Sequence, residues 1–154
     1  MATAPGAAEI ETANLKARPA VETVRDGAWL ASYPWDRTKR ATLIQSLAPL
    51  DIDDAAARIG RLAGLNRRRS LPPIFRITPF AGPLIETALD TMAWSRCEES
   101  LTLVRGLDEA PFDIGASFRR FAPTDKDWIK AQGALHRLGF AETYRYHYRR
   151  GQDQ

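Results

Sequence analysis

The sequence predicts one α/β or α+β domain with a mixed sheet of about five strands and about four helices. Stretches with the apolar spacing of helices alternate with stretches that alternate like strands. The chain has 154 residues, which is long enough to bury a core without staples. Its composition, 44% hydrophobic and 27% charged, is typical of globular proteins.

The N-terminal third is expected to hold a short helix and a hairpin. Residues 1–8 lack any hydrophobic period and are predicted to be a disordered tail. A helix is predicted over Glu9–Lys16, because Pro19 stops it shortly afterwards. Two strands, Trp29–Tyr33 and Ala41–Leu47, are predicted to pair as the hairpin.

A second helix is predicted to follow an aspartate cap, either Asp51 or Asp53, and to end near Asn66. Its inward face is an apolar stripe at helical spacing, formed by Ile52, Ala56, Ile59 and Leu62 or Ala63. Arg58 and Arg61 are expected to point away from that stripe.

The next segment predicts a strand, a helix and a strand. Pro72-Pro73 precedes the strand Ile74–Thr78, and Gly82-Pro83 opens the helix. The apolar positions of that helix are Leu84 or Ile85, Ala88 or Leu89, and Met92. The strand Ser100–Val104 follows. Residues 106–123 have no sustained period and are predicted to be a linker.

The last element, residues 124–150, is predicted to be a helix, a glycine stop and a strand. Thr124 and Asp127 resemble a capping box before the helix that runs to Leu138. Gly139 ends the helix, and Phe140–Tyr148 alternates like a strand. We expect this strand to share one sheet with Ile74–Thr78 and Ser100–Val104, in an order that the sequence leaves open.

Two groups of residues carry a resemblance to a known family. The first group is the string Ala134-Leu135-His136-Arg137-Leu138-Gly139-Phe140 followed by Tyr146-His147-Tyr148-Arg149. It resembles the C-terminal helix and strand of bacterial GNAT-superfamily N-acetyltransferases. The second group comprises Ala20-Val21-Glu22-Thr23-Val24, Gly27-Ala28-Trp29-Leu30 and Leu71-Pro72-Pro73-Ile74-Phe75-Arg76-Ile77-Thr78-Pro79-Phe80. This group resembles the N-terminal lobe of a two-lobed subgroup of that superfamily. The resemblance places this lobe in residues 9–105.

The resemblance implies acyl transfer with acetyl-CoA as cosubstrate, but the chain departs from the family where the chemistry is done. The family's strand, glycine-rich turn and long helix, which hold the pyrophosphate of coenzyme A, have no counterpart in the sequence. Gly60 and Gly64 lie inside a helical pattern, so they are not expected to form a phosphate cradle. Leu135 stands where the family has its thiolate-protonating tyrosine. His136, one residue away, is the candidate catalytic residue by a one-residue slip, although an exposed helix histidine is the plainer interpretation.

Arginines dominate the centre of the chain. Residues 55–80 contain six arginines and no acid: Arg58, Arg61, Arg67, Arg68, Arg69 and Arg76. Such a block attracts phosphate, although a solvated helix face and loop are the plainer interpretation. Nucleic-acid binding is not expected, because no aromatic residue lies between Ala55 and Leu71 to stack on bases.

Other chemistries are poorly supported. With two histidines and one cysteine, no metal site is expected. Cys97 is expected to lie at a helix end, and Glu98 and Glu99 to be cap or turn charges. The tyrosines at positions 144, 146 and 148 are expected to share one strand face, either as sheet packing or as a surface that stacks on a ligand ring.

The function predicted from these residues is that of a shortened GNAT-like N-acetyltransferase with weak or no activity. The alternative is a non-catalytic binding or interaction module on a GNAT-derived scaffold. The chain lacks an apolar run of membrane-spanning length, and its first twenty residues do not form a signal peptide, so a cytoplasmic location is expected. The bias of 18 arginines over 4 lysines is typical of a GC-rich bacterial coding sequence.

A partner chain is also expected. If the coenzyme-binding strand is missing, Phe140–Tyr148 would be left at an unpaired sheet edge, which invites pairing. A homodimer, or a complex with a complete acetyltransferase, would cover the tyrosine face and leave Arg145 and Arg149 at the rim. Alternatively, residues 106–115 or the N-terminal tail cover the edge and the chain is a monomer.

Overall fold

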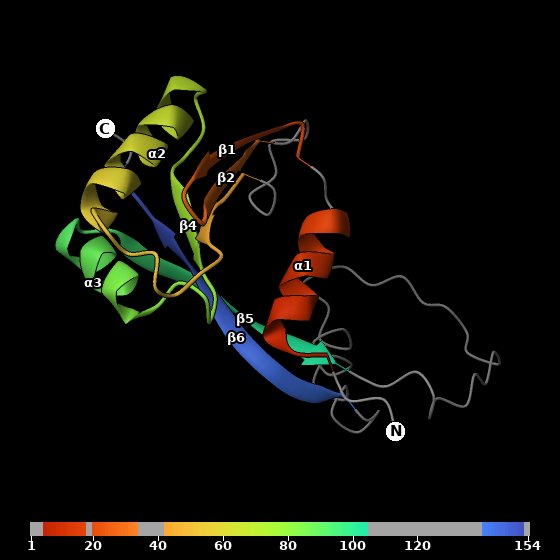
Figure 1. Cartoon of the computed structure of the whole chain (residues 1–154). Coiled ribbons are helices and arrows are strands. Elements are labelled where there is room, and N and C mark those ends of the chain that lie inside the picture. Colours follow the sequence, from red (N-terminus) through yellow and green to blue (C-terminus); the bar gives the residue numbers. More distant parts are fainter. Residues whose placement is uncertain (1–4, 18–19, 34–41, 105–139, 153–154) are drawn as a thin grey trace, which may run out of the picture.

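The computed structural model describes residues 5–17, 20–33, 42–104 and 140–152 (Figure 1). These residues form a mixed α+β fold, as predicted, with three helices and one six-stranded sheet. The elements in chain order are α1 (Ala7–Ala17), β1 (Glu22–Asp26), β2 (Trp29–Tyr33), β3 (Ile44–Ser46), α2 (Ala55–Arg68), β4 (Ile74–Ile77), α3 (Pro83–Thr91), β5 (Ser95–Val104) and β6 (Ala141–Arg150).

The strand order in the sheet is β1-β2-β3-β4-β6-β5. Among the described strands only the β3–β4 pair is parallel, and α2 provides the crossover between these two strands. The predicted hairpin of β2 and β3 is confirmed. The prediction that β4, β5 and β6 belong to one sheet is also confirmed, and both pairings of β6 are antiparallel.

The position of β6 corrects one expectation. This strand pairs with β4 along one side and with β5 along the other, so it is an interior strand and not a free edge. The premise for a dimer through the Phe140–Tyr148 edge was therefore wrong. Among the described residues the outer strands are β1 and β5, and β5 has features that discourage pairing: a bulge at Glu98 and the charged side chains of Arg96 and Glu99.

The two faces of the sheet are covered differently. Figure 1 shows α2 and α3 on one side of the sheet and α1 on the other. The main core lies under α2 and α3, where Ile59 and Ile85 pack with Trp29, Ile44 and Phe75. Each of these five side chains is fully buried. Gly82 and Pro83 open α3 as predicted, and of the alternatives left open Ile85 and Leu89 face the core while Leu84 is exposed.

Strand β5 differs from its prediction. It begins at Ser95 instead of Ser100, so Cys97, Glu98 and Glu99 lie in a strand and not at a helix end or in a turn. Glu98 has a φ of 49° at the register shift between Cys97 and Glu99. This bulge breaks the alternation of side chains that would have marked a strand in the sequence.

Two further points concern the whole chain. No helix in the described part of the chain is long and apolar enough to cross a membrane. The predicted linker 106–123, the helix ending at Leu138 and the candidate catalytic residue His136 lie outside the described residues.

Candidate functional site

The loop between β3 and α2 is the candidate position for a phosphate-binding site, because β3, α2 and β4 form a strand–helix–strand unit. Parallel units of this kind bind ligands at the carboxyl ends of their strands, where a helix start offers free backbone N–H groups. The loop here is Leu47-Ala48-Pro49-Leu50-Asp51-Ile52-Asp53-Asp54. It contains three aspartates and no glycine.

Contrary to the expectation, Asp51 is not the N-cap of α2. It connects the loop to the β1–β2 turn instead. Its carboxylate accepts hydrogen bonds from the Ala28 N–H at 2.6 Å and from Arg58 Nη1 at 2.7 Å. Its backbone carbonyl accepts the Trp29 indole N–H at 2.7 Å. Hydrogen bonds from Arg58 and from the Ala28 N–H lower the pKa of the Asp51 carboxyl. The residue at the N-cap is Asp54, whose φ of 52° is left-handed and whose side chain makes no capping bond.

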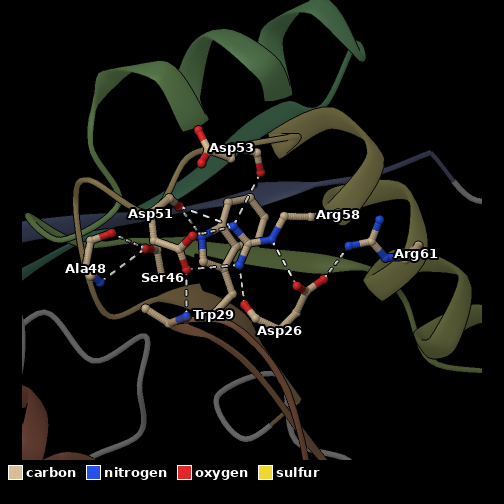
Figure 2. A network of polar contacts seen from close by, with 9 residues as sticks. Asp26, Trp29, Ser46, Ala48, Asp51, Asp53, Arg58 and Arg61 are labelled. Atoms are coloured by element: carbon tan, nitrogen blue, oxygen red, sulfur yellow. Dashed lines mark hydrogen bonds and ion pairs between the residues drawn. The ribbon is translucent and has the colours of Figure 1, made fainter.

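Arg58 faces the protein interior, contrary to the sequence-based expectation. Figure 2 shows its guanidinium between Asp26 and Asp51. Arg58 Nε donates to Asp26 Oδ1 at 3.1 Å, and its guanidinium carbon lies 4.3 Å from the centre of the Trp29 ring. Arg61, which is exposed, reaches the other oxygen of Asp26 at 2.7 Å. Both arginines are therefore neutralised by carboxylates.

These contacts make the start of α2 acidic. Asp53 and Asp54 are exposed there, and the positive charges of Arg58 and Arg61 are already paired with Asp26 and Asp51. An anion at this helix start would meet uncompensated negative charge, which opposes the favourable helix dipole.

The loops that follow β3 and β4 also pack against each other. Gly82, which precedes α3, has a φ of 72°, and a Cβ atom on it would lie 2.9 Å from the carbonyl oxygen of Pro49. Ser46 tightens the same loop by donating from its hydroxyl to the Ala48 carbonyl at 2.9 Å. The carboxyl ends of the two parallel strands therefore meet packed backbone.

The rest of the arginine block is engaged as well. Arg69 donates to Glu22 at 2.5 Å and stacks over the Tyr33 ring at 4.2 Å. Arg67 donates to the Gln152 carbonyl at 3.1 Å. Arg76 is buried beneath α1 and forms an ion pair with Glu11. Five of the six arginines thus serve contacts within the chain, and Arg68 is exposed at the end of α2.

A buried polar group lies under α1. Arg76 from β4 and Tyr144 from β6 donate hydrogen bonds to Glu11 of α1, and Gln45 from β3 accepts a hydrogen bond from Arg76. All four residues are buried. Sequence reasoning missed Glu11 and Gln45, but it had a usable signal: Arg76 interrupts the otherwise apolar strand Ile74–Ile77, and a buried arginine requires an acceptor.

The tyrosines of β6 share one face, as predicted. Tyr144 and Tyr148 are buried and Tyr146 lies between them, with ring centroids 6.4 Å and 5.7 Å away. Arg145 is exposed as expected, whereas Arg149 is buried on the opposite face. The Arg149 side chain forms an ion pair with Asp90 of α3 and donates to the Trp94 carbonyl at 3.3 Å. It is not available at a polar rim.

His147, next to Arg149 in sequence, is also buried against α3. Its Nε2 atom lies 3.5 Å from a carboxylate oxygen of Glu86 and makes no hydrogen bond. Burial lowers the pKa of His147. Across the described residues no group of three or more histidine, cysteine, aspartate or glutamate side chains is arranged to hold a metal ion.

Comparisons with protein-family models, with curated proteins and with solved structures found no significant match for this chain.

Proposed function

We propose that this chain is a shortened GNAT-like protein, related to acyl-CoA-dependent N-acetyltransferases, with weak or no transfer activity. The relationship rests on the resemblance of residues 9–105 and 134–149 to the two lobes of that family. The loss of activity rests on one observation: the helix start that follows β3 carries exposed carboxylates where a phosphate-binding start needs free N–H groups and no negative charge.

Charge repulsion opposes binding of the acetyl-CoA pyrophosphate at this helix start. The pyrophosphate of acetyl-CoA would approach Asp53 and Asp54, while Arg58 and Arg61 are held by Asp26 and Asp51. Two like unit charges about 4 Å apart repel each other by roughly 1 kcal/mol in water. The sequence also lacks the family's glycine-rich turn, whose backbone N–H groups hold the pyrophosphate. Leu135 at the position of the family's tyrosine leaves the departing thiolate without its usual acid, with His136 as the remaining candidate.

A second candidate function is a binding or interaction module on the same scaffold, and the polar group under α1 favours it. The donors of Arg76 and Tyr144 converge on a single carboxylate, which is the geometry of a recognition site rather than of a proton-transfer site. A buried arginine whose donors are already bonded to a glutamate has no evident role in acetyl transfer.

The experiment that tests this proposal is a thiol-release assay with acetyl-CoA and a panel of amines, including polyamines and peptide N-termini. We expect no saturable release above the rate without protein. Turnover that saturates in both substrates would refute the proposed loss of activity, and His136→Ala would then be the first variant to test.

The proposal extends to location and partners. We place the protein in the cytoplasm, with a homodimer or a complex with a complete acetyltransferase as the expected assembly. Because β6 is an interior strand, such an assembly would have to use another surface than the edge first considered. Light scattering at several concentrations tests it, and a constant mass of one chain would rule the homodimer out.

A further inference from the structure

Helix α1 lies against the sheet in an unusual way, because its one buried residue is charged. Glu11 is buried, whereas Ile10 and Leu15 are only partly covered and Ala13 is exposed. A surface helix normally docks through an apolar stripe. The attachment of α1 to the sheet therefore depends mainly on one carboxylate.

Arg76 of β4 and Tyr144 of β6 form the receiving side of this contact. Arg76 Nη2 donates to Glu11 Oε1 at 2.8 Å, and Arg76 Nη1 donates to the second carboxylate oxygen. The hydroxyl of Tyr144 donates to the same Oε1 atom. A planar guanidinium fork and a phenol thus clasp both oxygens of one carboxylate, which is the arrangement by which proteins recognise carboxylates.

The site is held in place by contacts that do not involve α1. Arg76 Nη1 also donates to Gln45 Oε1 at 3.2 Å, and the guanidinium carbon lies 4.1 Å from the centre of the Tyr146 ring. Tyr146 in turn packs edge-on against Tyr148. Because β3, β4 and β6 are joined by the sheet, the guanidinium remains positioned when α1 is displaced.

The titration of these groups agrees with strong recognition of an anion. Burial by itself opposes ionisation of Glu11, but the hydrogen bonds from Arg76 and Tyr144 outweigh it, and the pKa of Glu11 is lowered. For Tyr144, burial and the nearby Glu11 raise the pKa of the phenol, so it stays a donor.

The attachment of α1 is nevertheless weak in net terms. A buried ion pair recovers little more than the desolvation cost of its two charges. Segments with few buried apolar side chains open locally at low free-energy cost. A carboxylate from another molecule can then replace Glu11 without leaving Arg76 unpaired.

We propose that Arg76 and Tyr144 form a binding site for the carboxylate of a ligand, and that Glu11 is an internal occupant which the ligand displaces together with α1. The proposal deepens the binding role proposed above and rests on it. The ligand class is a monocarboxylate group, because the site offers one guanidinium. Such a group is carried by small carboxylic acids and by acidic side chains of a protein segment.

The test uses the full chain with Glu11→Ala, which empties the carboxylate position. Sodium acetate is titrated at constant ionic strength against sodium chloride, and binding is followed by NMR shifts of the Arg76 and Tyr144 signals. If α1 is open in about a tenth of wild-type molecules or fewer, removing Glu11 lowers the apparent Kd for acetate about tenfold or more. Glu9→Ala, an exposed glutamate of the same helix, is the matched control and should behave like wild type.

Two results would overturn the proposal. One is the absence of saturable acetate binding to the Glu11→Ala chain. The other is binding of equal strength in the double variant Glu11→Ala/Arg76→Gln. If Glu11→Ala does not fold, hydrogen exchange of the wild-type chain decides: acetate, but not chloride, should speed the exchange of the α1 amides, and equal rates in both salts would refute displacement.

A second arm separates the two sources of the carboxylate. A blocked peptide of residues 5–17 and its Glu11→Gln counterpart are added to the Glu11→Ala chain. Tighter binding of the Glu11 peptide than of acetate supports an acidic protein segment as the ligand, and equal or weaker binding supports a small acid. Acetyl-CoA has no carboxylate, so acetyl-CoA binding would refute the proposed function without touching this site.

Discussion

Gly27 holds a conformation on which the whole Asp51 cluster depends. Its φ is 60°, and it occupies the two-residue turn between β1 and β2. A Cβ atom there would lie 2.6 Å from Asp51 Oδ2 and 2.9 Å from Arg58 Nη2. The glycine therefore allows the ion pair between the turn and α2 to form.

Gly27→Ala is expected to destabilise the protein by about 1 to 3 kcal/mol, because it adds left-handed strain and pushes the ion pair apart. The measurement is urea unfolding followed by circular dichroism. Gly60→Ala is the control: Gly60 lies inside α2 with nothing within 4 Å of a new Cβ, so the same change should stabilise by about 0.5 to 1 kcal/mol. Equal effects of the two changes would contradict the account.

His147 makes stability depend on pH near neutrality. Its pKa in the folded protein is lowered, first by burial and then by the charge of Arg96, against the opposing effect of Glu86. Below the ordinary value of about 6.5, the unfolded chain binds a proton that the folded chain resists. The free energy of unfolding should therefore fall as the pH decreases from 7 toward 5.

In the variant His147→Gln this part of the pH dependence should be flatter, since no imidazole remains at that position. Urea unfolding at several pH values measures it. A slope between pH 7 and pH 5 that is unchanged by the substitution would show that His147 does not carry the effect.

At the scale of elements, α1 is the least firmly held of the three helices in the described residues. It buries only Glu11, whereas α2 buries Ile59 and Leu62, and α3 buries Ile85 and Leu89. Hydrogen exchange should therefore be faster for the amides of α1 than for those of α2 and β6, because α1 opens without disturbing the core. Protection of α1 as strong as that of β6 would contradict this.

The sequence predicted best those elements whose signals are local. Gly82 and Pro83, followed by apolar residues at helical spacing, located α3 correctly. Strand β1 was not predicted, because its residues are mostly polar and lack the alternation of apolar and polar side chains that marks a strand in a sequence. The inward orientation of Arg58 was missed because helical spacing within α2 says nothing about its partners. Asp26 and Asp51, which supply half-buried acceptors, lie elsewhere in the chain.

At the scale of the whole molecule, the arrangement of strands was beyond what the sequence could predict. The last strand inserts between β4 and β5, so its neighbours are set by pairings that are distant in sequence. Alternation shows that a strand exists, but not beside which strand it lies. The edge predicted for β6 failed for this reason, although membership of the common sheet was correct.

This arrangement also bears on where a phosphate group could bind among the described residues. The sheet contains one parallel pair, β3–β4, and the loops at its carboxyl end are packed together at Pro49 and Gly82. Asp53 and Asp54, which directly precede α2, are exposed. The described part of the molecule thus offers a closed, acidic end at the place where parallel strand–helix–strand units commonly bind phosphate.

The most direct test of the central claim is titration calorimetry of acetyl-CoA into the wild-type chain at low salt, where any attraction to phosphate would be strongest. We expect no saturable heat in the micromolar range, because the start of α2 carries uncompensated carboxylates and the sequence contains no glycine-rich phosphate-binding turn. Saturable binding with a Kd of a few micromolar would contradict it and restore an acyl-CoA-dependent enzyme as the function of this chain.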